Sequence, residues 1–171
     1  EVLMEKVVCI EGPDNIGKTT LCKMIAKEFN GTLFHLGAPK KKGNDALKEQ
    51  LATLSKVYAR MEDASTLEVW DRSVIGECIY GPLYREYNHE MYWNALQEIK
   101  RYQKNILLVV MYADALTHMR WCVKPKGDEK EAYQKKQKST MRYLSSVVGG
   151  GDPAPNFLNM WMNTGYLVEF L

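Results

Sequence analysis

The sequence predicts an α/β fold, in which helices cover both faces of a doubly wound parallel sheet of about five strands. Mostly apolar runs alternate along the chain with stretches of helical periodicity, as expected when strands and helices alternate. The run ILLVVMY at 106–112 is apolar at every position except the last, which is typical of a parallel strand buried on both faces. Folds of this class bind ligands at the carboxyl ends of their strands.

The elements follow from two patterns. Strands are expected where mostly apolar residues run together, and helices where apolar residues recur every three or four positions. The predicted strands cover 7–10, 32–36, 66–70, 106–112 and 166–171. The predicted helices cover about 18–30, 45–62, 75–87, 89–103, 115–122 and 131–148.

Glycine, proline and asparagine mark the boundaries between these elements. Asn30-Gly31 would end the first helix, and Gly37 to Gly43 forms a loop with Pro39 and three lysines. A second loop contains Gly149-Gly150-Gly151. With 171 residues and no internal repeat, the chain is predicted to form one domain spanning 1–171.

The stretch VVCIEGPDNIGKTT at 7–20 has the spacing Gly-x-x-x-x-Gly-Lys-Thr, which predicts a phosphate-binding P-loop between a strand and a helix. Glycines let backbone N–H groups turn toward an anion, and the helix N-terminus adds a positive dipole. The lysine would reach the β- and γ-phosphates of ATP, and the first threonine would be a ligand of Mg²⁺. The predicted cofactor-binding residues are Gly12, Asn15, Ile16, Gly17, Lys18, Thr19 and Thr20.

Asp71-Arg72 is the second informative feature, because it directly follows a predicted buried strand. An aspartate at this point of a P-loop protein can hold Mg²⁺ together with Thr19, and the arginine can clamp a phosphate. The alternative is that Asp71 caps the next helix and Arg72 is a surface residue.

Composition and charge narrow the classes of function and partner that remain possible. The formal net charge of +2 is too small to indicate nucleic acid by itself, although the clusters Lys40–Lys42 and Lys135–Lys138 leave DNA open as a substrate. Four dispersed cysteines indicate reduced thiols of a cytoplasmic protein. Neither a membrane span nor a signal peptide is expected. The sequence leaves open whether the chain forms a homodimer.

The motif EGPDNIGKTT resembles the P-loop of thymidylate kinases, and WDRS resembles their Asp-Arg motif. Together with HLGAP at 35–39, the stretch 71–85 is similar to thymidylate-kinase-like proteins of bacteriophages. This resemblance implies phosphoryl transfer from ATP to a deoxynucleoside monophosphate, in the host cytoplasm if the protein is phage-encoded. It also implies that Asp14 lies near the sugar 3′-hydroxyl and that Arg72 contacts the acceptor phosphate. Arg120 and a lid over about 120–131 would close over the phosphates.

The chain departs from that family at several positions. Asn15 stands where some thymidylate kinases have an arginine, and the lid offers Lys124 and Lys126, which cannot imitate the planar arginine fork. An acceptor hydroxyl is therefore a second interpretation, for example the hydroxymethyl group of a modified pyrimidine in phage DNA, or a nucleoside. The segment HLG at 35–37 lacks the glutamate that deoxynucleoside kinases typically have there, which weakens the nucleoside version. A nucleotide-binding switch without turnover is a third interpretation.

The acceptor decides which other side chains matter. A hydroxyl acceptor profits from a carboxylate base, for which Asp14, Asp71 and Glu77 are candidates; Glu77 could equally be a solvated helix residue. The remaining candidates for binding the substrate are His35, Tyr80, Tyr84 and Arg85. The tyrosines could stack on a base or only pack against the core, and His35 could be purely structural.

Overall fold

The computed structural model describes residues 6–111 and 167–170. The helices expected at 115–122 and 131–148, the loop expected at 149–155, and the lid with Arg120 lie outside these residues. The expected single domain stays a prediction for the same reason.

The centre of the fold is a five-stranded sheet in the order β2-β3-β1-β4-β5. Every neighbouring pair of strands is parallel, so the predicted doubly wound fold class is confirmed. All five residues of β1 are buried, as expected for a parallel strand covered on both faces. The strands are β1 (Val7–Glu11), β2 (Thr32–His35), β3 (Glu68–Asp71), β4 (Ile106–Met111) and β5 (Leu167–Phe170).

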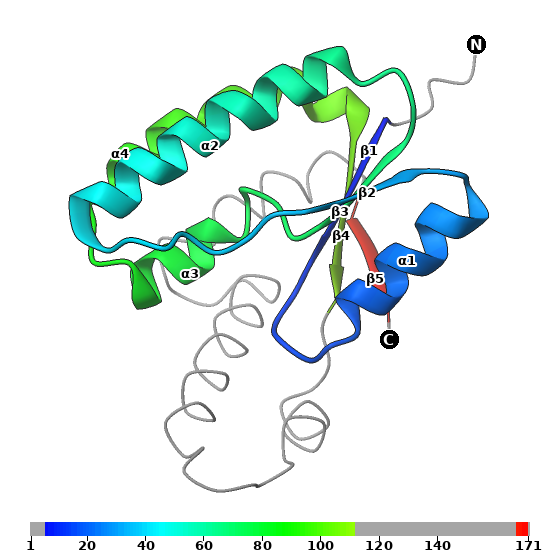
Figure 1. Ribbon diagram of the computed structural model, residues 1–171, viewed down its shortest axis with the longest axis horizontal. Coiled ribbons are helices and arrows are strands. Elements are labelled where there is room, and N and C mark those ends of the chain that lie inside the picture. The colour runs from blue at the N-terminus through cyan, green and yellow to red at the C-terminus, as the bar shows by residue number, and fades with distance from the viewer. Residues whose placement is uncertain (1–5, 112–166, 171) are drawn as a thin grey trace, which may run out of the picture.

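Helices cover both faces of this sheet (Figure 1). One helix, α1, lies on one side of the strands, and α2, α3 and α4 lie on the other side. Two apolar clusters fill the two layers, one between α1 and the sheet and a larger one beneath the remaining helices. The helices are α1 (Lys18–Glu28), α2 (Gly43–Asp63), α3 (Glu77–Tyr84), α4 (His89–Leu96) and the 3₁₀ segment η1 (Gln97–Asn105).

Side-chain spacing explains how α2 packs. Its buried residues recur at helical spacing and form one stripe that faces the larger cluster. One member of this stripe, Gln50, is polar and only 4% exposed. The hydroxyl of Tyr58 bonds the carbonyl oxygen of Ala95 at 3.2 Å, which ties α2 to the end of α4.

Most predicted boundaries differ from the observed ones by a residue or two, and the departures at three elements have a clear description. The helix expected at 75–87 is shorter, because Glu86 adopts a left-handed conformation with φ 58° and the side chain of Asn88 caps α4 by accepting from the N–H of Glu90 at 3.0 Å. The helix expected at 89–103 ends at Leu96 and continues as η1. The third strand begins at Glu68 rather than 66 and includes Asp71.

The register of the strands determines where their polar ends meet. Ile10 and His35 both pair with Asp71 across the sheet, so Glu11 lies one residue beyond. The first residues after β1, β2 and β3 therefore share one edge of the sheet, which is where an α/β fold binds its ligands.

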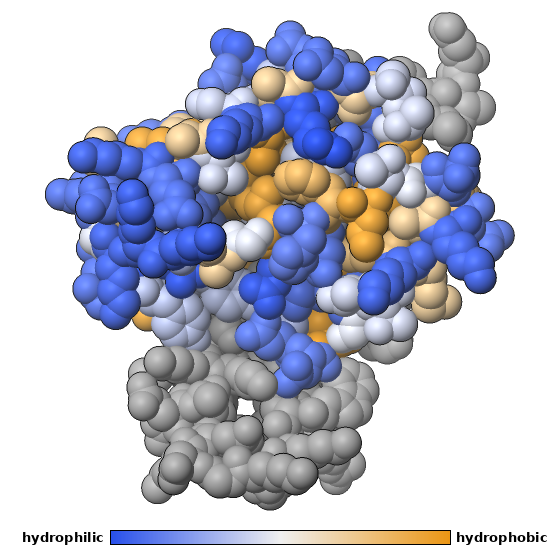
Figure 2. Space-filling view, viewed as in Figure 1, coloured by the Kyte–Doolittle hydropathy of each residue, from blue (hydrophilic) through white to orange (hydrophobic). Residues whose placement is uncertain are grey.

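The view in Figure 2 shows hydrophobic residues gathered over the β2 edge of the sheet, between α1 and α2. Phe29, after α1, is 66% exposed, and Leu33, in β2, is 42% exposed. None of the helices in the described part of the chain is long and apolar enough to cross a membrane.

Candidate nucleotide-binding and acceptor site

The loop between β1 and α1 has the backbone of a phosphate-binding turn. Gly12 has φ 147° and Gly17 has φ 96°, and between them Asn15 has φ 61°. Residues other than glycine rarely adopt the backbone conformations seen at Gly12 and Gly17. Gly17 is the residue that precedes α1, so the loop delivers its backbone directly to the positive end of a helix dipole.

Lys18 is the first residue of α1 and is only 5% exposed. Its ammonium group donates to the carbonyl oxygen of Pro13 at 2.5 Å, across the mouth of the loop. Burial lowers the pKa of Lys18, and the nearby Arg72 lowers it further. An ammonium group has three donors, so two of them are available for phosphate oxygens.

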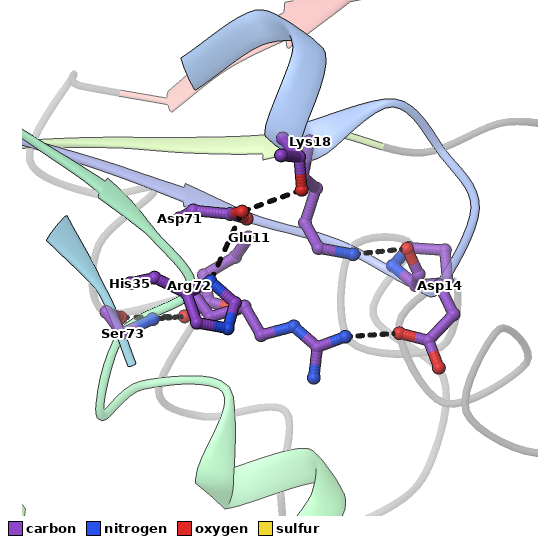
Figure 3. Close-up of polar contacts among 9 residues, drawn as sticks. Glu11, Asp14, Lys18, His35, Asp71, Arg72 and Ser73 are labelled. Carbon is purple, nitrogen blue, oxygen red and sulfur yellow. Dashed lines mark hydrogen bonds and ion pairs between the residues drawn. The ribbon is translucent and has the colours of Figure 1, made fainter. Parts of the chain in front are cut away.

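Asp71, at the carboxyl end of β3, is the centre of a second polar group (Figure 3). Its Oδ2 accepts a hydrogen bond from the Thr19 hydroxyl at 2.7 Å. The Nδ1 atom of His35 lies 3.3 Å from the same oxygen. Asp71 is 3% exposed, so this edge of the sheet presents a carboxylate and a hydroxyl side by side beneath the loop.

Arg72 connects this edge to the P-loop. One of its guanidinium nitrogens lies 2.7 Å from Oδ1 of Asp14, and its guanidinium carbon lies 5.8 Å from the centre of the Tyr80 ring. The backbone of Arg72 has φ 69°, a left-handed conformation that costs about 1 kcal/mol or more for a residue with a side chain. The fold therefore places Arg72 against an intrinsic backbone preference.

A cleft opens beside Arg72, away from Lys18. The space in it that can hold water is about 30 Å³, so it is a shallow cleft that opens to solvent. Its wall is built from the end of β1, the loop after β2, helix α2 and the β3–α3 segment. The polar side chains that line it are Glu11, Gln50, Arg72, Ser73, Glu77 and Arg85.

Glu77 and Arg85 form an ion pair in this cleft. The Nε atom of Arg85 lies 3.3 Å from Oε1 of Glu77, and the Tyr87 hydroxyl donates to the same oxygen at 2.9 Å. Burial raises the pKa of Glu77, and the contacts with Arg85 and Tyr87 oppose that shift without cancelling it. The cleft therefore contains a carboxyl group that takes up a proton more readily than an exposed glutamate does.

This pKa shift predicts a pH dependence of stability. A carboxyl whose pKa is raised in the folded state stabilises the fold below its ordinary pKa of 4.5, and this contribution is lost as pH rises through the folded-state pKa. Glu77→Gln removes the titration. We expect the free energy of unfolding of the variant, minus that of the wild type, to grow as pH rises above 4.5 and then to level off. Urea unfolding across that range measures it; a difference that shrinks with rising pH would contradict the shift.

The structure brings most of the predicted site residues to this one edge of the sheet. Tyr80 lines the cleft and stacks on Tyr84, with ring centres 6.1 Å apart; Tyr84 itself is not part of the cleft wall. In the P-loop, Ile16 is buried, and Asn15 and Thr20 are exposed. Arg120 lies outside the described residues.

Three polar residues that line the cleft, Glu11, Gln50 and Ser73, were not predicted from the sequence. Glu11 could have been noticed as a charged residue that ends an otherwise apolar strand, and Gln50 as a polar residue within the apolar stripe of α2. The roles of all the candidate residues stay predictions.

The hydroxyl oxygen of Thr19 and the carboxylate of Asp71 are suitable ligands for a magnesium ion. Mg²⁺ in P-loop proteins takes a hydroxyl and a carboxylate from the protein and the rest of its shell from phosphates and water, and the pair formed by Thr19 and Asp71 supplies that set. Among the described residues, no group of three or more His, Cys, Asp or Glu side chains is arranged to hold a metal. A metal there would depend on the nucleotide.

Comparisons with known proteins agree with this geometry. The ATPase family associated with various cellular activities (AAA) matches residues 8–76, the part of the chain that contains the P-loop and Asp71-Arg72. No curated protein matches the chain.

Solved structures match over nearly the whole chain. The YorR protein from Bacillus subtilis, in complex with phosphorylated GDP, is similar with a TM-score of 0.59 at 17% identity, over 96% of this chain and 83% of that one. Deoxyadenosine kinase from M. mycoides, with the products dCMP and dCDP bound, is similar with a TM-score of 0.55 at 15% identity, over 96% of this chain and 89% of that one.

The same kinase with bound dATP is similar with a TM-score of 0.55 at 14% identity, over 96% of this chain and 90% of that one. The chain thus has the fold of P-loop NTPases, with a P-loop sequence between β1 and α1. Its structural neighbours include a deoxyadenosine kinase.

Proposed function

We propose that this protein is a kinase that transfers the γ-phosphoryl group of ATP to a deoxynucleoside monophosphate. The observation that carries the proposal is the cleft next to the P-loop. Arg72 and Arg85 both line this cleft, and Arg72 also contacts Asp14 of the P-loop. Two arginines suit an acceptor that carries a phosphate. The similarity to deoxyadenosine kinase, whose structures hold dCMP, dCDP or dATP, supports phosphoryl transfer as the class of reaction.

The donor half of the reaction would use the P-loop. The backbone around Gly12 and Gly17 cradles the phosphates of ATP, and Lys18 neutralises charge on the β- and γ-phosphates. Thr19 and Asp71 would hold Mg²⁺, which neutralises charge on the phosphates when bound. The contribution of the protein is to position the reactants and stabilise charge, because phosphoryl transfer requires little covalent chemistry from an enzyme.

The acceptor half would use the cleft. A monophosphate presents an oxygen that is already anionic, so its attack on the γ-phosphorus needs no strong base. Arg72 would bind the acceptor phosphate near the P-loop, and Tyr80 would offer a ring for the base or sugar.

The segment 120–131, with Arg120, would close over the phosphates as a lid of the same domain. A phage origin belongs to this proposal as an implication of the resemblance.

A hydroxyl acceptor is the second candidate, and the buried Glu77 favours it. A carboxyl group in the cleft with a raised pKa can accept the proton of a hydroxyl group as the oxygen attacks. The acceptor would then be a nucleoside, or a hydroxymethyl pyrimidine in DNA. The three exposed lysines at 40–42 follow Gly37 and Ala38, which line the cleft, and could contact a DNA backbone.

One experiment separates these candidates. Labelled ATP and Mg²⁺ are incubated with the protein and, in parallel, with each deoxynucleoside monophosphate, each nucleoside, and duplex DNA with and without hydroxymethyl pyrimidines. Label in a nucleoside diphosphate supports the monophosphate kinase and identifies its base. Label only in a nucleoside monophosphate or only in modified DNA supports the hydroxyl acceptor. Stoichiometric nucleotide binding without transfer to any acceptor would contradict both and favour a switch.

A further inference from the structure

Glu11 is a buried carboxylate that no step of the proposed reaction uses. It is the last residue of β1 and is only 2% exposed, yet it lines the cleft. Its Oε1 accepts hydrogen bonds from the N–H of Ser73 at 2.6 Å, the hydroxyl of Ser73 at 2.7 Å and the N–H of Gly76 at 3.2 Å. A carboxylate on which three donors converge forms strong, charge-assisted bonds.

These three donors belong to one short turn, residues 72–76, which connects β3 to α3. The Ser73 hydroxyl also accepts from the N–H of Ile75 at 3.1 Å. Gly76 packs directly against the carboxylate, because a Cβ added there would lie 2.7 Å from Oε2 of Glu11. The turn is therefore built around the Glu11 side chain.

The same turn contains Arg72 in its left-handed conformation. The N–H of Arg72 donates to the carbonyl oxygen of Ile10 at 3.1 Å, and the N–H of Ser73 donates to Glu11. The end of β1 therefore holds the backbone on both sides of the Arg72 Cα atom. At the other end of the side chain, Asp14 of the P-loop holds the guanidinium group at 2.7 Å. Both anchors of Arg72 thus come from the segment 10–14 that precedes Lys18.

We propose that Glu11 is a positioning residue, which fixes the 72–76 turn so that the Arg72 guanidinium points between the P-loop and the cleft. The role of Arg72 in binding the acceptor rests on the proposed function. The role of Glu11 in fixing the 72–76 turn does not depend on it. Glu11 would affect acceptor use by acting through Arg72, and it would leave ATP binding nearly unchanged.

A double-mutant cycle tests this coupling. Glu11→Gln keeps an oxygen that can accept, but it removes the charge and places an NH₂ group against Gly76. We expect kcat/KM for the acceptor to fall about tenfold to a hundredfold, as for a misplaced binding group, while KM for ATP changes less than about twofold. In an Arg72→Ala background, the same substitution should cost less than about twofold, because coupled residues are not additive.

The matched control is Glu68→Gln. Glu68 is a second buried carboxylate, and its Oε2 accepts from Arg60 and from Trp70, both at 2.8 Å, but it lies at the opposite end of β3. Its loss should lower stability without changing KM for the acceptor. If Glu11→Gln and Arg72→Ala multiply their effects, or if Glu68→Gln gives the same loss of acceptor use, the proposal is wrong.

Hydrogen exchange provides a measurement that does not depend on activity. The amides of Ser73 and Gly76 should exchange faster in Glu11→Gln than in wild type, whereas they should keep their protection in Glu68→Gln. If Glu11→Gln does not fold, Ser73→Ala removes one of the three donors and should cost about threefold in acceptor kcat/KM. Unchanged protection of the turn overturns the inference. Absent transfer by a wild type whose turn is protected overturns only the proposed function.

Discussion

Lys18→Ala is expected to lower phosphoryl transfer from ATP by about a hundredfold to a thousandfold, the usual cost of removing one donor that stabilises a developing charge. The Lys18 ammonium is nearly buried and reaches across the P-loop to the carbonyl of Pro13. No other described lysine lies in the loop, so no second ammonium group there can replace this one. The measurement is the initial rate of transfer to the best acceptor at saturating ATP.

Lys23→Ala is the control for this substitution. Lys23 belongs to the same helix α1, but it is exposed, so its loss should change the rate by less than about twofold. Lys18→Arg is informative as well, because a planar guanidinium does not fit a place built for an ammonium, and we expect it to remain impaired. A Lys18→Ala variant with full transfer activity would refute the kinase proposal.

The parts of the site that lie close together in sequence could be predicted. The P-loop is one continuous segment, and its glycine spacing directly reflects the positive φ values of Gly12 and Gly17. Asp71 and Arg72 are adjacent and follow an apolar strand, so a single pattern located both. In each case the residues that act together are neighbours in the chain, and the backbone between them is short.

The parts of the cleft that depend on tertiary packing could not be predicted. The bond between Glu11 and Ser73 joins residues that are 62 positions apart, and no local pattern relates them. Gln50 lies in the apolar stripe of α2, and only the packing of that helix shows that this position lines a cleft. The end of α3 was predicted at residue 87 rather than at Tyr84, because Glu86, not a glycine, takes the left-handed conformation there.

Gly12→Ala is expected to destabilise the protein by about 2–4 kcal/mol, because it combines backbone strain with overpacking. Gly12 has φ 147°, and an added Cβ would collide with the carbonyl oxygen of Met111 at the end of β4 and lie 3.3 Å from Cγ2 of Ile16. The Met111 carbonyl is backbone at the end of a paired strand, so it cannot move aside as a flexible side chain would. The loop would have to shift instead, and nucleotide binding would be lost with it.

Gly37→Ala is the matched control, because a Cβ at Gly37 meets no atom within 4 Å, and its stability should change by no more than about 1 kcal/mol. Urea unfolding compares the two variants with wild type, and the rise in Tm on adding ATP and Mg²⁺ reports nucleotide binding. Equal stability of the two variants would mean that the P-loop does not pack against the end of β4. A Gly12→Ala protein that is destabilised but still gains Tm with ATP would show that the loop tolerates a shifted backbone. In that case the side chains of Lys18 and Thr19, rather than the exact path of the glycine turn, would dominate nucleotide binding.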